Sequence, residues 1–214
     1  MGKDTRDMIL SNRKYVHGFC ARFVQSVLSS EFGMNITADE LRDFLFSHEY
    51  LMFSYQEYML VDKYYCVLQY SMVSEGPISV EFVNNIYRTV YASRVGVRID
   101  SDRNVPVYVA KDLEVAFRKY LEDNQPRFAD RLFNLMRHVK DSRIYCYDII
   151  GRIIMVRELL QAGYPAVDFM NWHDVALAVH NNDREMFYKS LNLMIDEECR
   201  IMNEYDMKVE VEEL

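Results

Sequence analysis

Glycine and proline are scarce in this chain, with 7 and 4 residues among 214. A many-stranded barrel or sandwich needs frequent tight turns, which these two residues usually supply. Their scarcity therefore argues against such folds and favours long helices with short connections. Because 50% of the residues are hydrophobic and 14% are aromatic, the chain can bury a sizeable core. We expect a single domain that is mainly α.

Long hydrophobic runs are also missing. The sequence has no stretch of about 18 apolar residues that could cross a membrane, and its first residues lack the apolar core of a secretion signal. These absences predict a cytoplasmic protein with no membrane partner. An effector exported without a cleaved signal would show the same pattern.

The cysteines are not arranged as in metal sites or disulfide frameworks, and the basic residues are too few for a nucleic-acid-binding surface over the whole chain. The four cysteines form no CxxC pair and no cluster with histidine, so neither a metal site nor a disulfide framework is expected. Acidic residues outnumber basic ones by 33 to 25, which gives a net charge of -8. Such a chain has no overall attraction for phosphate backbones, and nucleic acid is not an expected partner.

What the chain does have is apolar residues spaced every three or four positions, which is typical of amphipathic helices. Thr37 and Glu40 have the spacing of a capping box and predict the start of one of them. The helices are expected over residues 6–30, from about 40, and over 54–71, 80–90, 110–122, 126–140, about 150–162, 171–181 and 184–203. The domain should cover residues 1–205, with an N-terminal helical part of about 1–75 and a core of about 76–200. The acidic tail, residues 206–214, is expected to fray.

One segment has a different period. In VGVRIDSDRNVPVYV, residues 95–109, apolar residues alternate with others on both sides of a polar turn. This alternation predicts a β-hairpin, and Pro106 suggests that its second strand lies on an edge.

The stretch GRIIMVRELLQAGYPAVDF, residues 151–169, resembles the central segment of the Fic (Fido-fold) family. That family carries H-x-F-x-[DE]-G-N-G-R-x-x-R followed by an apolar helix and an A-G-Y-P end. SSEFGMNIT (29–37), DKYYCVL (62–68) and IYRTVY (86–91) are similar to further family segments in the same order. The resemblance implies a helical bundle with a small hairpin flap beside the active loop. It also implies transfer of AMP from ATP, with Mg²⁺, to a protein hydroxyl.

The aligned motif keeps three of its chemical positions. The resemblance makes Gly151 and Arg152 candidates for binding a phosphate or nucleotide, and Asp148 a candidate metal ligand. The position of the catalytic histidine is held by Ile144, which cannot take a proton near neutral pH as imidazole does. No catalytic residue of the motif is therefore intact.

The phosphate cradle is altered as well. Ile149 and Ile150 stand where the motif has Gly-Asn, and Met155 stands where it has the second arginine. Glycines let a backbone approach an anion closely, whereas two isoleucines bring apolar bulk and fit a helix that extends backwards through the former loop.

Each retained residue also has a structural interpretation. The i, i+4 spacing of Asp148 and Arg152 fits an intrahelical ion pair as well as a metal and phosphate site. His138, the nearest histidine, fits the surface end of a helix better than a substitute base. The glutamate that restrains many family members aligns with Gly33 rather than with Glu31, so the resemblance implies that this restraint is absent as well.

Two features could bind a protein instead. Gly96, Val97 and Arg98 resemble part of the family's flap, which pairs with an extended segment of the target, although the hairpin could equally cover the core. The chain also has 16 tyrosines, several of them clustered between residues 50 and 70. These tyrosines either pack in the core and at its boundary or form a face that binds a protein.

These observations predict a degenerate Fic-fold protein without AMP-transferase activity that acts through protein binding or regulation and needs no cofactor. The alternative is a remodelled nucleotidyl- or phospho-group transferase that uses Asp148 and Arg152 with ATP and Mg²⁺. A structural role in a homo-oligomer is a third hypothesis.

Overall fold

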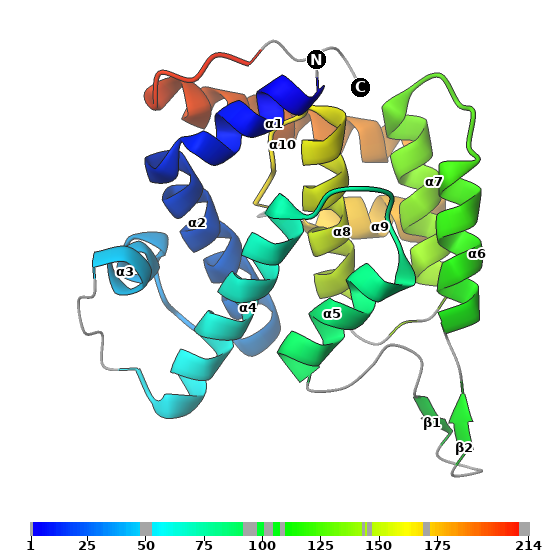
Figure 1. The fold of residues 1–214 in the computed structure, drawn as a ribbon, viewed down its shortest axis with the longest axis horizontal. Coiled ribbons are helices and arrows are strands. Elements are labelled where there is room, and N and C mark those ends of the chain that lie inside the picture. Colours follow the sequence, from blue (N-terminus) through cyan, green and yellow to red (C-terminus); the bar gives the residue numbers. More distant parts are fainter. Residues whose placement is uncertain are drawn as a thin grey trace.

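The computed structural model of the chain describes residues 2–47, 53–91, 98–100, 105–107, 110–142, 144, 147–168 and 172–209. These residues are mainly α, in agreement with the scarcity of glycine and proline (Figure 1). In chain order the elements are α1 (Gly2–Ser11), α2 (Arg13–Phe32), α3 (Ala38–Arg42), a π-helical turn (Asp43–Ser47), α4 (Tyr55–Val73), α5 (Val80–Tyr91), β1 (Arg98–Asp100), β2 (Val105–Val107), α6 (Ala110–Leu121), α7 (Phe128–Asp141), α8 (Tyr147–Ala162), α9 (Trp172–Asn181) and α10 (Arg184–Glu204).

The helix α8 is the centre of the fold. It packs against α1, α4 and α7, and Figure 1 shows it in the middle of the molecule. Every residue from Ile149 to Leu160 is buried. The rest of the domain therefore surrounds α8 on all sides, although three of its buried residues, Arg152, Arg157 and Glu158, are charged.

The expected helix over residues 6–30 is wrong in one respect, because the chain breaks it in two. The side-chain oxygen of Asn12 accepts a hydrogen bond from the backbone N–H of Tyr15 and so caps the start of α2. The apolar spacing continues across this break, which is why the pattern alone conceals it. At the other end, Gly33 has φ of 64° and ends α2 in the left-handed conformation that glycine adopts without strain.

The start of α3 is a capping box, as the sequence predicts. The hydroxyl of Thr37 accepts from the backbone N–H of Glu40, and the carboxylate of Glu40 accepts from the backbone N–H of Thr37. Ser54 and Glu57 form a second box at the start of α4. Both boxes satisfy N–H groups that would otherwise lack partners at a helix start.

Two short strands lie inside the segment for which a hairpin is expected. β1 and β2 pair antiparallel, with Arg98 opposite Val107 and Asp100 opposite Val105. Figure 1 shows this pair below α6, away from the centre of the bundle. Gly96 and Val97 lie outside the described residues, and Arg98 is the first residue of β1.

The packed part of the chain extends to at least Met207, inside the tail that is expected to fray. Met207 is buried in the core, and its N–H donates to the carbonyl of Met202. Residues 210–214 of the expected tail lie outside the described part of the chain. None of the described helices combines the length and the hydrophobicity needed to cross a bilayer.

Candidate functional site

The segment aligned with the phosphate cradle is helical. α8 begins at Tyr147, ahead of both aligned isoleucines, and Ile150 is 0% exposed. From the fifth residue of a helix onwards, each backbone N–H is bonded to a carbonyl four residues earlier. Gly151 is the fifth residue of α8, so its N–H group belongs to the helix and is not free to bind an anion.

Gly151 has a packing role. A Cβ atom added to it would lie 2.9 Å from Cε of Met136 on α7, and 3.0 Å from the ring of Trp172 on α9. Real Cβ atoms almost never approach heavy atoms this closely, because protein interiors are already densely packed. The glycine therefore allows α7 and α9 to contact α8 directly.

Arg152 is held inside the protein. Its guanidinium lies 3.8 Å from the carboxylate of Glu31, at the end of α2, and Nη1 donates to the hydroxyl of Ser26 over 3.5 Å. The guanidinium also lies over the ring of Trp172, 5.6 Å from the ring centre. Burial lowers the pKa of Arg152, and the charges of Glu31 and Asp148 oppose that shift. Glu31 thus contacts the first arginine of the aligned motif.

Asp148 is exposed and has a different partner from the one its spacing suggests. One carboxylate oxygen accepts a hydrogen bond from the indole N–H of Trp172 over 3.1 Å. The ion pair of Arg152 is with Glu31, and not with Asp148 as the i, i+4 spacing predicts. The described residues contain no group of three His, Cys, Asp or Glu side chains that could hold a metal.

The other substituted positions are also part of the core. Ile144, at the position of the histidine, is buried, and so is Met155 at the position of the second arginine. Sequence reasoning missed Trp172, which contacts Asp148, Gly151 and Arg152 together. The only sequence feature that could have pointed to Trp172 is that it is the single tryptophan of the chain.

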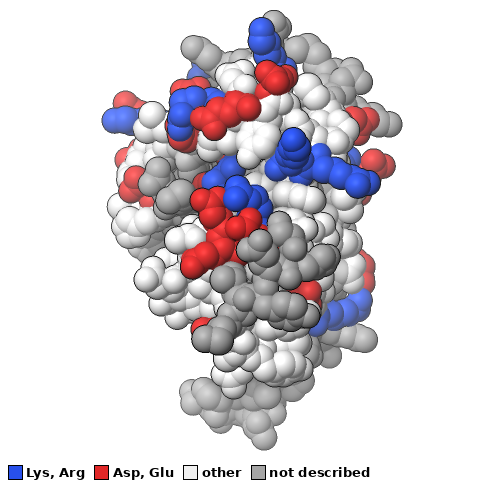
Figure 2. Space-filling model, turned by 90° about the vertical axis from the view of Figure 1, so that its left-hand side faces the viewer, with Lys and Arg blue, Asp and Glu red and all other residues white. Residues whose placement is uncertain are grey.

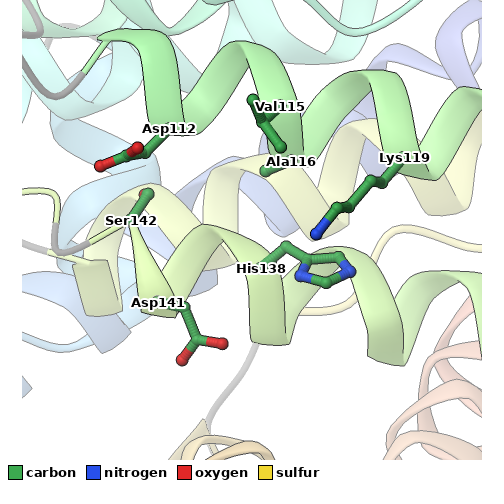
Figure 3. Close-up of a pocket in the computed structure, with 7 residues that line it drawn as sticks. All are labelled: Asp112, Val115, Ala116, Lys119, His138, Asp141 and Ser142. Atoms are coloured by element: carbon green, nitrogen blue, oxygen red, sulfur yellow. The ribbon is translucent and has the colours of Figure 1, made fainter.

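His138 lies in a separate pocket of about 330 Å³ between α6 and α7 (Figure 3). The ammonium group of Lys119 lies beside its ring, whereas Asp112 and Ser142 lie toward the other end of the pocket. Partial burial and the charge of Lys119 lower the pKa of His138. Asp148 and Arg152 are not lining residues of this pocket. The histidine and the aligned phosphate residues thus do not form one site.

Helix α8 carries a second buried arginine, Arg157. Arg157 donates to Glu158 and to the backbone carbonyl of Gly76, and its guanidinium lies over the ring of Phe82 at 5.1 Å. Burial raises the pKa of Glu158, and the charge of Arg157 opposes that shift. The contacts of Arg157 join α8 to the segment between α4 and α5, which is a structural function.

Three exposed tyrosines lie on α4. Tyr55 is 77% exposed, Tyr58 is 45% exposed and Val73 is 60% exposed, and Tyr70 is exposed as well. At 100° per residue these four positions fall within about 120° of the helix circumference, so they share one side, which we call the α4 face. Figure 2 shows the side of the molecule toward which the start of α4 points. Its charged side chains gather in the upper half and the middle, and the described surface below them is mostly uncharged.

Comparison of the chain with protein-family models, with curated proteins and with solved structures finds no match.

Proposed function

We propose that this protein is a non-catalytic, Fic-like helical domain that acts by binding a partner protein through the α4 face. The observation that carries the proposal is a contrast between two regions. Gly151 and Arg152 are buried inside the fold, where Arg152 pairs with Glu31, whereas Tyr55 and Tyr58 of the α4 face are exposed.

The chemistry of the α4 face suits a protein partner. Tyrosine buries a large apolar area and keeps a hydroxyl for a hydrogen bond, which is why it is enriched at the energetic centres of protein interfaces. Tyr70 is already positioned for this, because its hydroxyl accepts from Asn85 and its ring stacks on Phe82. A side chain fixed in this way loses less conformational entropy when a partner binds.

The absence of transferase activity is tested with ATP, ADP and Mg²⁺. Binding at 100 times the dissociation constant would stabilise the protein by about 2.7 kcal/mol, which a melting curve detects. We expect no shift at millimolar nucleotide and no transfer of label from ATP to protein. Transfer that Arg152→Ala abolishes would overturn the proposal.

The binding role is tested with the double variant Tyr55→Ser, Tyr58→Ser. A matched control is Leu193→Ser, since Leu193 is 60% exposed on α10 and lies outside the α4 face. We expect the wild type and the control to bind the partner equally well. The double variant should bind it at least about tenfold more weakly. Equal binding by all three would exclude the α4 face. If the partner is a second copy, sedimentation will show a dimer that the double variant dissociates.

A further inference from the structure

A second pocket, distinct from the α4 face, lies between α2, the start of α3 and the end of α10. Its volume is about 310 Å³, and its lining includes Gly18, Arg22, Arg42, Glu204 and Tyr205. Pockets of this size are at the lower end of those that hold small organic ligands. The sequence positions that form it are almost 190 residues apart, so no local motif reveals it.

Two hydrogen-bond donors meet in this pocket without a partner. Arg22 donates through Nε to Asp168 over 3.0 Å and through Nη2 to Glu198. In the part of the chain that the structure describes, Nη1 of Arg22 and the hydroxyl of Tyr205 make no hydrogen bond. The point where a Cβ of Gly18 would lie is 3.1 Å from this hydroxyl and 3.6 Å from Nη1. The two donors therefore converge on the side-chain position of Gly18, which the hydroxyl of Tyr205 already approaches closely.

The arginine is held in place from behind. Asp168 and Glu198 hold two of its three nitrogens, and Glu198 also accepts a hydrogen bond from Tyr15 over 2.8 Å. The ring of Tyr205 packs edge-on against Tyr15, with ring centres 5.8 Å apart. Neither donor must reorganise to meet a ligand, and such preorganisation raises affinity.

Charges at the rim of the pocket are already paired. Arg42 bonds Asp39 over 3.0 Å, and Glu204 pairs with Arg200 over 3.4 Å. The available recognition groups are therefore the two inner donors. One carboxylate, with two oxygens that each accept hydrogen bonds, matches a guanidinium N–H and a hydroxyl. A dianion such as phosphate fits less well, because Asp168 and Glu198 lie directly behind Arg22.

We propose that this pocket binds a small organic carboxylate, which accepts hydrogen bonds from Nη1 of Arg22 and from the hydroxyl of Tyr205 above Gly18. The carboxylate could belong to a free small molecule or to the C-terminal end of a peptide, since both present the same group.

Binding is coupled to a proton. Burial raises the pKa of Glu198 to about 7, and the charge of Arg22 opposes the shift. The charged or titratable groups that interact with Glu198 are Tyr15 and Arg22 on α2, Asp168 after α8, and Cys199 beside it on α10. A bound carboxylate competes for the charge of Arg22 and so raises the pKa of Glu198 further. Affinity should therefore increase as the pH falls from about 8 to about 6.

The test is a titration of the whole chain with sodium propionate at constant ionic strength, followed by the amide signal of Gly18 in nuclear magnetic resonance spectra. A ligand this small should bind with a dissociation constant on the order of 1 to 10 mM. Propionamide, which has the same shape without the charge, should bind about tenfold more weakly, and inorganic phosphate should also bind more weakly than propionate.

Two variants locate the site. Gly18→Ala places a methyl group against both donors and should abolish propionate binding, while the end of Tyr205 shifts and the protein stays folded, since alanine favours the helix. Tyr205→Phe should weaken binding about tenfold, whereas Tyr65→Phe, on α4, should leave it unchanged. Loss of the pH dependence in Glu198→Gln would support the proton coupling.

The proposal is overturned if propionate gives no saturable shift, if phosphate or propionamide binds as well as propionate, or if Gly18→Ala binds normally. A short peptide with a free carboxyl end, compared with its amide, separates the two sources. Tighter binding of the free peptide than of propionate points to a chain end, and weaker binding points to a small molecule.

Discussion

Two helical glycines in this protein face opposite surroundings. Gly151 on α8 lies against Met136 and the ring of Trp172, whereas Gly18 on α2 lies below a hydroxyl and a guanidinium at the edge of a pocket. The first glycine belongs to a Gly-Arg pair that would suggest phosphate binding, and its space is filled by apolar side chains. The second belongs to no recognisable motif, and its side-chain position is bordered by the ends of two polar side chains, Tyr205 and Arg22. The role of a helical glycine thus depends on which atoms a side chain at that position would contact.

The largest expected effect is on stability and concerns the buried part of α8, where Gly151 lies. Ile150→Ala should lower the free energy of unfolding by about 2 to 5 kcal/mol, because Ile150 is 0% exposed and its removal leaves a cavity. Urea denaturation measures this change. Val73→Ala, at an exposed position, should change the stability by less than about 0.5 kcal/mol. A small effect of Ile150→Ala would mean that this turn of α8 is a mobile cradle after all.

The same substitution at the two glycines sharpens the contrast. Gly151→Ala should destabilise the protein by about 1 to 3 kcal/mol through overpacking against Met136 and Trp172. Gly18→Ala should be neutral or stabilising by up to about 1 kcal/mol, because only the end of Tyr205 must shift and alanine favours the helix. Urea unfolding of both variants is the measurement. Equal destabilisation would show that the end of Tyr205 cannot move aside from Gly18.

The surroundings of Gly18 also predict a dependence on pH. The ordinary carboxyl pKa of 4.5 is raised to about 7 in folded Glu198, so the folded state binds more protons than the unfolded chain between these values. Stability from this group is therefore fully present below pH 4.5 and is lost as the pH rises through about 7.

Glu198→Gln should reduce the fall in stability between about pH 5 and about pH 8 by on the order of 1 to 2 kcal/mol. The neighbouring exposed Glu197, whose pKa is lowered by its hydrogen bond to Arg200, supplies the control. Glu197→Gln should leave the fall nearly unchanged. An identical effect of both variants would contradict the burial of Glu198.

The smallest expected effect is that of Tyr205→Phe in the absence of ligand. Among the described residues the hydroxyl of Tyr205 has no hydrogen-bond partner, so its removal should change the free energy of unfolding by less than about 0.5 kcal/mol. Tyr15→Phe removes a hydrogen bond to buried Glu198 and should cost about 1 kcal/mol or more. Thermal unfolding of both variants tests the difference.

The sequence indicates the parts of this fold that depend on neighbouring residues. Thr37 and Glu40 are three positions apart, and their capping box follows from that spacing alone. The apolar period likewise predicts most of the helices. It does not predict the break at Asn12, because apolar positions continue on both sides and only the side-chain bond to Tyr15 marks a new helix start.

The candidate sites depend on contacts between distant residues. That the resembled motif's histidine and glycine-asparagine pair are not present here is readable from Ile144, Ile149 and Ile150. The partners of Arg152 are not, since Glu31 lies more than 100 positions earlier in the chain. Asp148 and Arg152 have ideal ion-pair spacing, yet Trp172 and Glu31 are their partners. Gly18 and Tyr205 meet only because α10 returns to the start of α2.

The central claim is that the Gly-Arg pair of α8 belongs to a packed helix and not to an anion-binding loop. Hydrogen exchange of the Gly151 and Arg152 amides, measured with and without ATP and Mg²⁺, tests it most directly. Both amides should exchange only through global unfolding, as core helix amides do, and nucleotide should not change their rates. Fast exchange of these two amides that slows when nucleotide is added would contradict the account.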